Sequence, residues 1–261
     1  MPAAVWPFEF RSIDGLGNNP HEPALGASET EMVRLFPADY GDGLDTPAGS
    51  NRPSPRFISN QVSAQTEDRP NRVQATDFVW QWGQFLDHDL DETPIGSPTE
   101  AIDILVPAGD LYFDPLSLGT VTIPMDRSSW VRIDGVRQQI NEITAFIDAS
   151  NVYGTDATRA AALRTMDGTG KLKTSQGDLL PYNLDGLANA PAPTANFFLA
   201  GDIRANEQVG LTAMHTLFVR EHNFWAGWLL QFGIVDGDLI YELARAMIVA
   251  EMQAISYREF L

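Results

Sequence analysis

Residues 82–91, WGQFLDHDLD, carry a histidine, a glutamine and three carboxylates within ten positions. On a helix, Gln84 and His88 are four residues apart and share one face. Asp87 and Asp89 would flank His88 by about 100° on either side. Because a neutral imidazole near pH 7 can accept and return a proton, this segment could perform acid–base chemistry.

Apolar residues in and before this segment recur with the period of an α-helix packed on a core. They are Phe78, Val79, Trp82, Phe85, Leu86 and Leu90. We therefore expect a helix over about residues 75–90, with its polar groups on a mostly buried element. The alternative is a solvated helix end with a capped histidine.

Residues 142–154, EITAFIDASNVYG, offer side-chain oxygens at Thr144, Asp148 and Ser150. In an extended loop these oxygens point the same way, and the carbonyl of Phe146 can fill the gap between them. Calcium prefers such oxygen ligands, and a second carboxylate, such as that of Asp89, would help to bind it. A β-strand with one polar face is the other interpretation of the same pattern.

A third segment, residues 197–223, places Arg204 and Glu207 three positions apart, where a long apolar helix is expected to begin. Taken alone, the two residues would form an ordinary surface ion pair. The same helix carries four more polar residues that are expected to make structural hydrogen bonds: His215, Arg220, Glu221 and His222.

Together these segments resemble the animal-type haem peroxidases, the peroxidase and cyclooxygenase superfamily. The matching stretches are WGQFLDHDLDETP, TAFIDASNVYG and RANEQVGLTAMHTLFVREHN, and others run from FRSIDGLGNNP near the start to AMIVAEMQAISYREFL at the end. The resemblance implies a mainly α, animal haem peroxidase-like fold with an extended N-terminal arm and few short strands.

The resemblance also implies the role of each site residue. His88 would be the distal histidine, Gln84 its neighbour in the distal pocket, and Arg204 the distal arginine. Asp87 and Glu207 would form ester links to haem b. Ca²⁺ would be bound by Asp89, Thr144, Phe146, Asp148 and Ser150.

The implied reaction is the reduction of hydrogen peroxide coupled to oxidation of a small donor: a phenol, a halide or thiocyanate. It would serve the response to oxidative stress. His88 would move the proton, and the Arg204 guanidinium would stabilise the negative charge on the leaving oxygen. Two other functions stay open: a fatty-acid dioxygenase of the same superfamily, and a catalytically silent, calcium-stabilised binding or adhesion module.

In this family, the proximal histidine that binds iron lies roughly a hundred residues beyond the distal arginine. The chain ends at Leu261, and neither His215 nor His222 matches the proximal motif. We therefore expect the iron ligand to come from a missing C-terminal part or from a second chain. Gln208 stands where some members have a methionine, so a sulfonium link to haem is not expected.

The composition predicts a folded acidic protein, with 261 residues, 44% hydrophobic positions and a net charge of −18. This charge disfavours nucleic acid and anionic membranes as partners. The absence of cysteine excludes disulfides. Because secreted animal members of the family carry several disulfides, the resemblance implies a bacterial-type relative. The first residues lack the pattern of a cleaved signal, so secretion would need a non-classical or C-terminal export signal, and the localisation stays open.

The chain is expected to form one partial peroxidase domain over residues 1–261. Residues 1–70 would be an extended arm with a short helix near residues 29–35, and residues 71–261 a helical body that binds haem and calcium. Within the body we expect a hairpin at 130–137, a short helix at 156–165 and a surface loop at 167–196. Long helices are expected at about 207–232 and 236–259.

Overall fold

The computed structural model describes residues 9–49 and 51–261. Contacts between residues divide the chain into two units. The first comprises residues 1–30, 76–92 and 141–261, and the second comprises residues 31–75 and 93–140. Every residue proposed above for the site belongs to the first unit. The predicted arm, residues 1–70, falls across both units, and its wrapping on the body stays a prediction.

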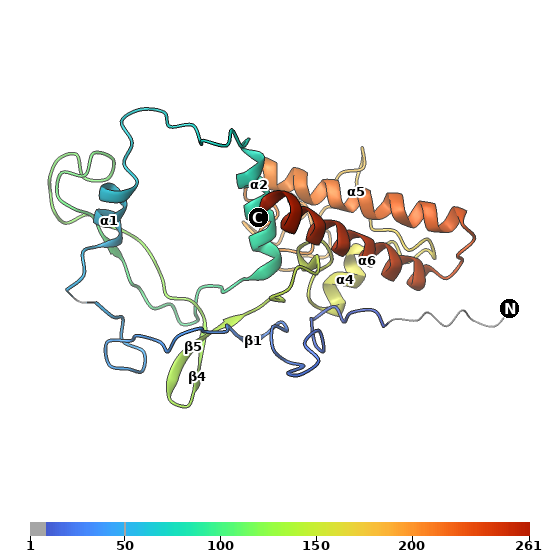
Figure 1. Cartoon of the computed structure of the whole chain (residues 1–261), viewed down its shortest axis with the longest axis horizontal. Helices are drawn as coiled ribbons and strands as arrows, with labels where there is room; N and C mark the ends of the chain where they lie inside the picture. The colour runs from blue at the N-terminus through green and yellow to red at the C-terminus, as the bar shows by residue number, and fades with distance from the viewer. Residues whose placement is uncertain (1–8, 50) are drawn as a thin grey trace. The chain divides into compact units, whose positions relative to one another are not determined.

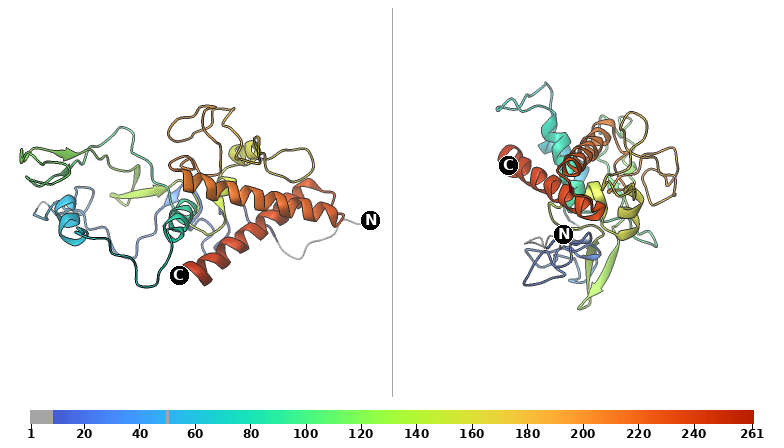
Figure 2. Two further views of the ribbon diagram at one scale, coloured as in Figure 1. Left: turned by 90° about the horizontal axis from the view of Figure 1, so that it is seen from above. Right: turned by 90° about the vertical axis from the view of Figure 1, so that its right-hand side faces the viewer.

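The first unit is helical. Its elements are α2 (Phe78–Leu90), α3 (Ser150–Tyr153), α4 (Ala157–Leu163), α5 (Val209–Gln231), α6 (Gly237–Ile255) and the π-helix η1 (Ser256–Phe260). The helix predictions at 75–90, 156–165, 207–232 and 236–259 are confirmed. Figures 1 and 2 show α5 and α6 joined by a short turn, and Figure 2 shows them diverging from it. No helix among the described residues is long and apolar enough to span a bilayer.

Side chains from α2, α3, α5 and α6 form the core of this unit. At its centre Phe85 of α2 stacks on Phe218 of α5, with ring centroids 5.0 Å apart. The apolar face predicted for α2 is correct from Trp82 onward, but Phe78 and Val79 are largely exposed. The prediction is wrong there because the first turn of α2 lies outside this core.

The second unit has little regular structure. It contains α1 (Pro55–Val62), the antiparallel pair β2 (Ile104–Leu105) and β3 (Thr122–Ile123), and the antiparallel pair β4 (Trp130–Ile133) and β5 (Val136–Asn141), whose last residue belongs to the first unit. The β4–β5 pair is the predicted hairpin. Its turn residues Asp134 and Gly135 both have positive φ, as tight hairpin turns require.

One local prediction and one alternative interpretation are wrong. The helix expected at 29–35 is absent, and the short strand β1 (Thr30–Glu31) takes its place. Glu29 has a φ of 60°, which an α-helix does not allow. The backbone N–H of Met32 donates to Gln139 O at 2.9 Å and is not part of a helical hydrogen bond. Residues 144–150 form no strand, because Ala149 has a φ of 64° and α3 starts directly after it.

Candidate functional site

His88 lies near the end of α2 and is 4% exposed. Its Nδ1 atom lies 3.6 Å from Asp202 Oδ1, and its Nε2 atom lies 3.9 Å from Glu207 Oε2. Both distances exceed those of a hydrogen bond. The imidazole is therefore held between two carboxylates without being tied tightly to either.

Burial lowers the pKa of His88 below its usual value of 6.5, although Asp202 opposes this effect. Removal from water disfavours the charged form of histidine more than the nearby carboxylates favour it. The imidazole is consequently neutral near pH 7. In that state a ring nitrogen can accept a proton.

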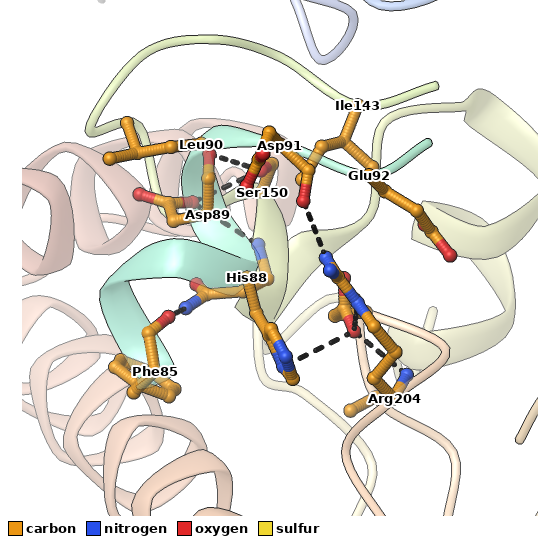
Figure 3. A network of polar contacts seen from close by, with 12 residues as sticks. Phe85, His88, Asp89, Leu90, Asp91, Glu92, Ile143, Ser150 and Arg204 are labelled. Carbon is orange, nitrogen blue, oxygen red and sulfur yellow. Dashed lines mark hydrogen bonds and ion pairs between the residues drawn. The ribbon is translucent and has the colours of Figure 1, made fainter. Parts of the chain in front are cut away.

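Arg204 is fixed by Asp202, which is 2% exposed. The guanidinium donates through Nε to Asp202 Oδ1 at 3.0 Å and through Nη2 to Oδ2 at 2.7 Å. Nη2 also donates to Asp91 O at 2.9 Å. Such a two-pronged pair fixes both the position and the plane of the guanidinium. Figure 3 shows the side chains of His88 and Arg204 lying close together.

Gln84 and Glu207 join the same network. Gln84 Nε2 donates to Glu207 Oε2 at 3.0 Å, and Gln84 Oε1 accepts from Gln208 Nε2 at 3.1 Å. The expected common face of Gln84 and His88 is thus present, since both side chains reach Glu207. The Glu207 side chain is 44% exposed, and Asp87 lies on the exposed side of α2.

Arg204 and Glu207 do not share a helix, contrary to the sequence prediction. Both residues precede α5, whose N-cap is Gln208. Gln208 has an extended backbone, and its side chain accepts from the N–H of Gly210. The helix therefore begins after Glu207, and a turn with Glu207 N donating to Arg204 O at 2.9 Å places the two side chains instead.

Four of the five residues proposed for calcium, Asp89, Thr144, Asp148 and Ser150, are joined by hydrogen bonds at the end of α2, and the carbonyl of the fifth, Phe146, accepts from Asp148 N at 2.9 Å. Asp89 is fully buried, and its Oδ2 accepts from the N–H groups of Asp148 at 3.1 Å and Ala149 at 3.2 Å. Its Oδ1 accepts from Ser150 Oγ at 3.0 Å (Figure 3). Thr144 Oγ1 donates to Asp148 Oδ1 at 2.8 Å. The loop is therefore folded around the Asp89 carboxylate.

Two carboxylates are buried together at this position. Burial and the proximity of Asp148 raise the pKa of Asp89 to about 8. Burial also raises the pKa of Asp148 to about 6. Among the described residues, no three His, Cys, Asp or Glu side chains gather to bind a metal. A cation would thus depend on these two carboxylates together with hydroxyl and carbonyl oxygens, which is a donor set suited to Ca²⁺.

Two residues of this network were not identified from the sequence. Asp202 connects His88 with Arg204, and its position two residues before Arg204 is the only signal that could have indicated it. Asn151 is buried and donates from Nδ2 to Phe85 O at 2.7 Å, which ties α3 to α2. No spacing rule relates Asn151 and Phe85, because they are 66 positions apart in the sequence.

The histidines of α5 differ from each other. His222 makes the structural hydrogen bonds that were predicted, with Tyr153 Oη at 2.8 Å and Gly170 O at 2.9 Å. The prediction is wrong for His215, whose ring nitrogens make no hydrogen bond of normal geometry, although the backbone of Asn151 lies near. His215 packs edge-on against Phe85, with ring centroids 5.0 Å apart, because its position on α5 faces the core.

We expect acid to destabilise the protein through His215. Burial lowers its pKa to about 4, from 6.5 when exposed, so the unfolded chain binds the proton more readily. The stabilising neutral form is fully present above pH 6.5 and is lost as the pH falls toward 4. Between pH 7 and pH 5 this costs about 2 kcal/mol of unfolding free energy. Urea titrations of the wild type and His215→Met should show a smaller pH dependence in the variant, and equal dependence would contradict this assignment.

Comparison with known proteins is consistent with this architecture. The family model described as animal haem peroxidase matches residues 10–261. Peroxidasin of Drosophila melanogaster is 36% identical over an alignment 299 residues long, which covers 97% of this chain and 19% of the relative. The chain thus spans about a fifth of the length of this curated relative.

Solved structures give the same result. Peroxidase A from Dictyostelium discoideum superposes with a TM-score of 0.83 at 29% identity, covering 97% of this chain and 53% of that one. A fatty acid alpha-dioxygenase of Oryza sativa has a TM-score of 0.74 at 25% identity, covering 97% of this chain and 39% of the dioxygenase chain. With its matching family model and its mainly helical fold, the chain belongs to the animal haem peroxidase family.

Proposed function

We propose that this chain provides the peroxide-binding side of a haem peroxidase that reduces hydrogen peroxide and oxidises a small donor. The observation that carries the proposal is Asp202, which binds Arg204 through both carboxylate oxygens and lies 3.6 Å from His88. It sets a neutral base and a fixed positive charge next to each other. Heterolytic cleavage of an O–O bond requires both.

His88 takes the proton from the peroxide oxygen that becomes bound and returns it to the oxygen that leaves. The Arg204 guanidinium stabilises the negative charge that develops on the leaving oxygen, and it needs no reorganisation because Asp202 already fixes it. Gln84 orients the peroxide from the same face of α2. Haem, when bound, supplies the iron and the electrons for this chemistry.

The residues present suit the distal face of a haem. His88 Nε2 points to the same region as Glu207 and Gln84, and the carboxylates of Asp87 and Glu207 are accessible enough to form ester links. None of the four histidines is assigned as the proximal ligand, since His21 is exposed, His222 is hydrogen-bonded at both nitrogens, and His215 lies in the core. That ligand is proposed to come from a further part of the protein or from a second chain.

Calcium is the second proposed cofactor, bound by Asp89, Thr144, Phe146, Asp148 and Ser150. Asp89 directly follows His88, so a cation here would fix the end of α2 that carries the base. It would also offset the cost of burying two carboxylates near each other.

Calcium should raise the melting temperature, and Asp148→Asn should abolish that rise. At a calcium concentration 100 times the Kd, binding to the folded state alone contributes about 2.7 kcal/mol. Melting curves with calcium and with a chelator, together with elemental analysis, measure the effect. The matched control is Asp185→Asn, at an exposed carboxylate. A wild type that holds no calcium and melts identically in both conditions would remove the site.

A fatty-acid dioxygenase remains the second candidate because a solved dioxygenase shares the fold. The accessible pair of Asp87 and Glu207 favours the peroxidase, since the dioxygenase branch generally lacks the ester links. A silent calcium-stabilised module would keep the fold without the reaction, and the combination of His88, Gln84 and Arg204 disfavours it. An activity assay with each candidate identifies the donor, which is a phenol, a halide or thiocyanate.

Haem titration followed by peroxide, carried out on the chain together with the part that supplies the proximal histidine, tests the proposed function. The protein should acquire a Soret band that shifts on addition of peroxide and returns when a phenolic donor is added. If no Soret band forms, or if peroxide leaves it unchanged, the proposal fails. A fatty acid consumed with oxygen in place of peroxide would establish the dioxygenase instead.

A further inference from the structure

Tyr153 and His222 form a buried pair within the core of the first unit. Tyr153, the last residue of α3, is 1% exposed, and its hydroxyl lies 2.8 Å from His222 Nδ1. His222 Nε2 lies 2.9 Å from the carbonyl oxygen of Gly170. Because a carbonyl only accepts, Nε2 carries the hydrogen and Nδ1 is left to accept from the phenol. The phenol therefore donates to a nitrogen that can take its proton.

We propose that Tyr153 is a redox-active tyrosine that forms a neutral radical by giving one electron to a strong oxidant and its hydroxyl proton to His222 Nδ1. In the proposed function, on which this inference rests for its oxidant, haem treated with peroxide would supply the strong oxidant that accepts the electron. The phenolic O–H bond breaks, an N–H bond forms on the imidazole, and the oxidant is reduced by one electron. A small donor then returns the electron, and the imidazolium returns the proton.

Burial sets the protonation state from which this transfer starts. Burial raises the pKa of Tyr153 well above 10 and lowers the pKa of His222 to about 4. At neutral pH the pair is thus an intact phenol and a neutral imidazole. After oxidation the positive charge lies on His222, whose Nε2–H donates to Gly170 O. The carboxylates of Glu242 and Glu251 act on Tyr153 from α6, and Arg245 opposes them.

Tyr241 provides an internal comparison. Its ring lies edge-on to that of Tyr153, with centroids 5.7 Å apart, and it is also buried. Its hydroxyl makes no hydrogen bond with any of the described residues. Oxidation of Tyr241 would leave its proton without an acceptor and a positive charge on a buried ring, which is costly. Of these two neighbouring tyrosines, only Tyr153 has a base.

A short route connects Tyr153 with the candidate site. Asn151, in the same short helix, donates from Nδ2 to Phe85 O at 2.7 Å. Phe85 lies three residues before His88 on α2. The pair is thereby linked to the peroxide-binding side through one hydrogen bond and the backbone of two helices. An oxidising equivalent can be stored there while the distal pocket exchanges ligands.

The experiment generates the oxidant photochemically, from a ruthenium polypyridyl complex with persulfate, in the full 261-residue chain. Freeze-trapped samples are measured by electron paramagnetic resonance, with ring-deuterated tyrosine to separate tyrosyl from tryptophanyl signals. We expect a persistent tyrosyl signal in the wild type and in Tyr241→Phe. The signal should be lost in Tyr153→Phe and fall toward background in His222→Asn, whose amide can accept a hydrogen bond but not the proton.

A wild type without a tyrosyl signal, a full signal in Tyr153→Phe, or its loss in Tyr241→Phe would overturn the proposal. Melting curves establish which variants fold. If the Tyr153 and His222 variants do not fold, the wild type still tests the proposal. Its radical should show a hyperfine coupling to ¹⁵N-labelled histidine. Absence of that coupling overturns the assignment. Since no haem is needed, failure of the peroxidase proposal and failure of this one are distinguishable.

Discussion

His88→Ala should slow the reaction of the haem-loaded protein with hydrogen peroxide by about 10²–10⁴-fold, the range supplied by a positioned general base. The variant removes the neutral imidazole that takes the peroxide proton and leaves Asp202, Arg204 and Gln84 in place. Haem binding should persist, because Asp87 and Glu207 are unchanged. Stopped-flow spectra of the Soret band after mixing with peroxide measure the rate.

His21→Ala is the matched control, since it makes the same substitution at an exposed histidine outside the site. Its rate should equal that of the wild type. Equal rates for His88→Ala and the wild type would exclude His88 as the base. Loss of the Soret band in His88→Ala alone would assign it to haem binding instead of proton transfer.

Periodic patterns were sufficient to predict α2, α5 and α6, but not the short helix α3. The apolar spacing around Trp82 and Phe85 predicted α2, and the long apolar runs predicted α5 and α6. Asp236 also caps α6 through the N–H groups of Asp238 and Leu239, as a start signal should. These features depend on neighbours within a few residues, which a sequence displays directly.

The parts that sequence reasoning missed depend on backbone conformations and on contacts between distant segments. The turn from Arg204 to Glu207 was expected to be helical, and only the extended backbone of Gln208 moves the helix start. Residues 144–150 were expected to be extended, and the left-handed Ala149 breaks that register. The left-handed region is rare for residues other than glycine, so a pattern of polar and apolar residues does not predict it.

Asp202 shows the same limit at the site itself. Taken alone, an aspartate two residues before an arginine indicates a local turn. Its importance arises because the turn brings it within 3.6 Å of His88, which is 114 positions earlier in the chain (202 minus 88). The sequence indicated the base and the cation of the site but not the residue that connects them.

Asp202→Asn should therefore disable the site while keeping its shape. The amide can accept through only one atom, so one of the two Arg204 bonds is replaced by a contact between donors, and the partly buried guanidinium loses its bonded counter-charge. The loss of unfolding free energy should stay below the roughly 3–5 kcal/mol that removal of one partner costs in a fully buried ion pair. The peroxide reaction should slow as well, because Arg204 is no longer held in place. Asp185→Asn is the control and should change neither quantity.

A double-mutant cycle separates positioning from simple loss of stability. Asp202→Asn and Arg204→Ala are measured singly and together, by urea unfolding and by the rate of reaction with peroxide. If Asp202 acts through Arg204, the double variant should react with peroxide no more slowly than Arg204→Ala alone, since nothing remains for Asp202 to hold. If the effects of the two substitutions on the activation free energy add, Asp202 acts independently of Arg204. In that case its contact with His88 would be the one that matters.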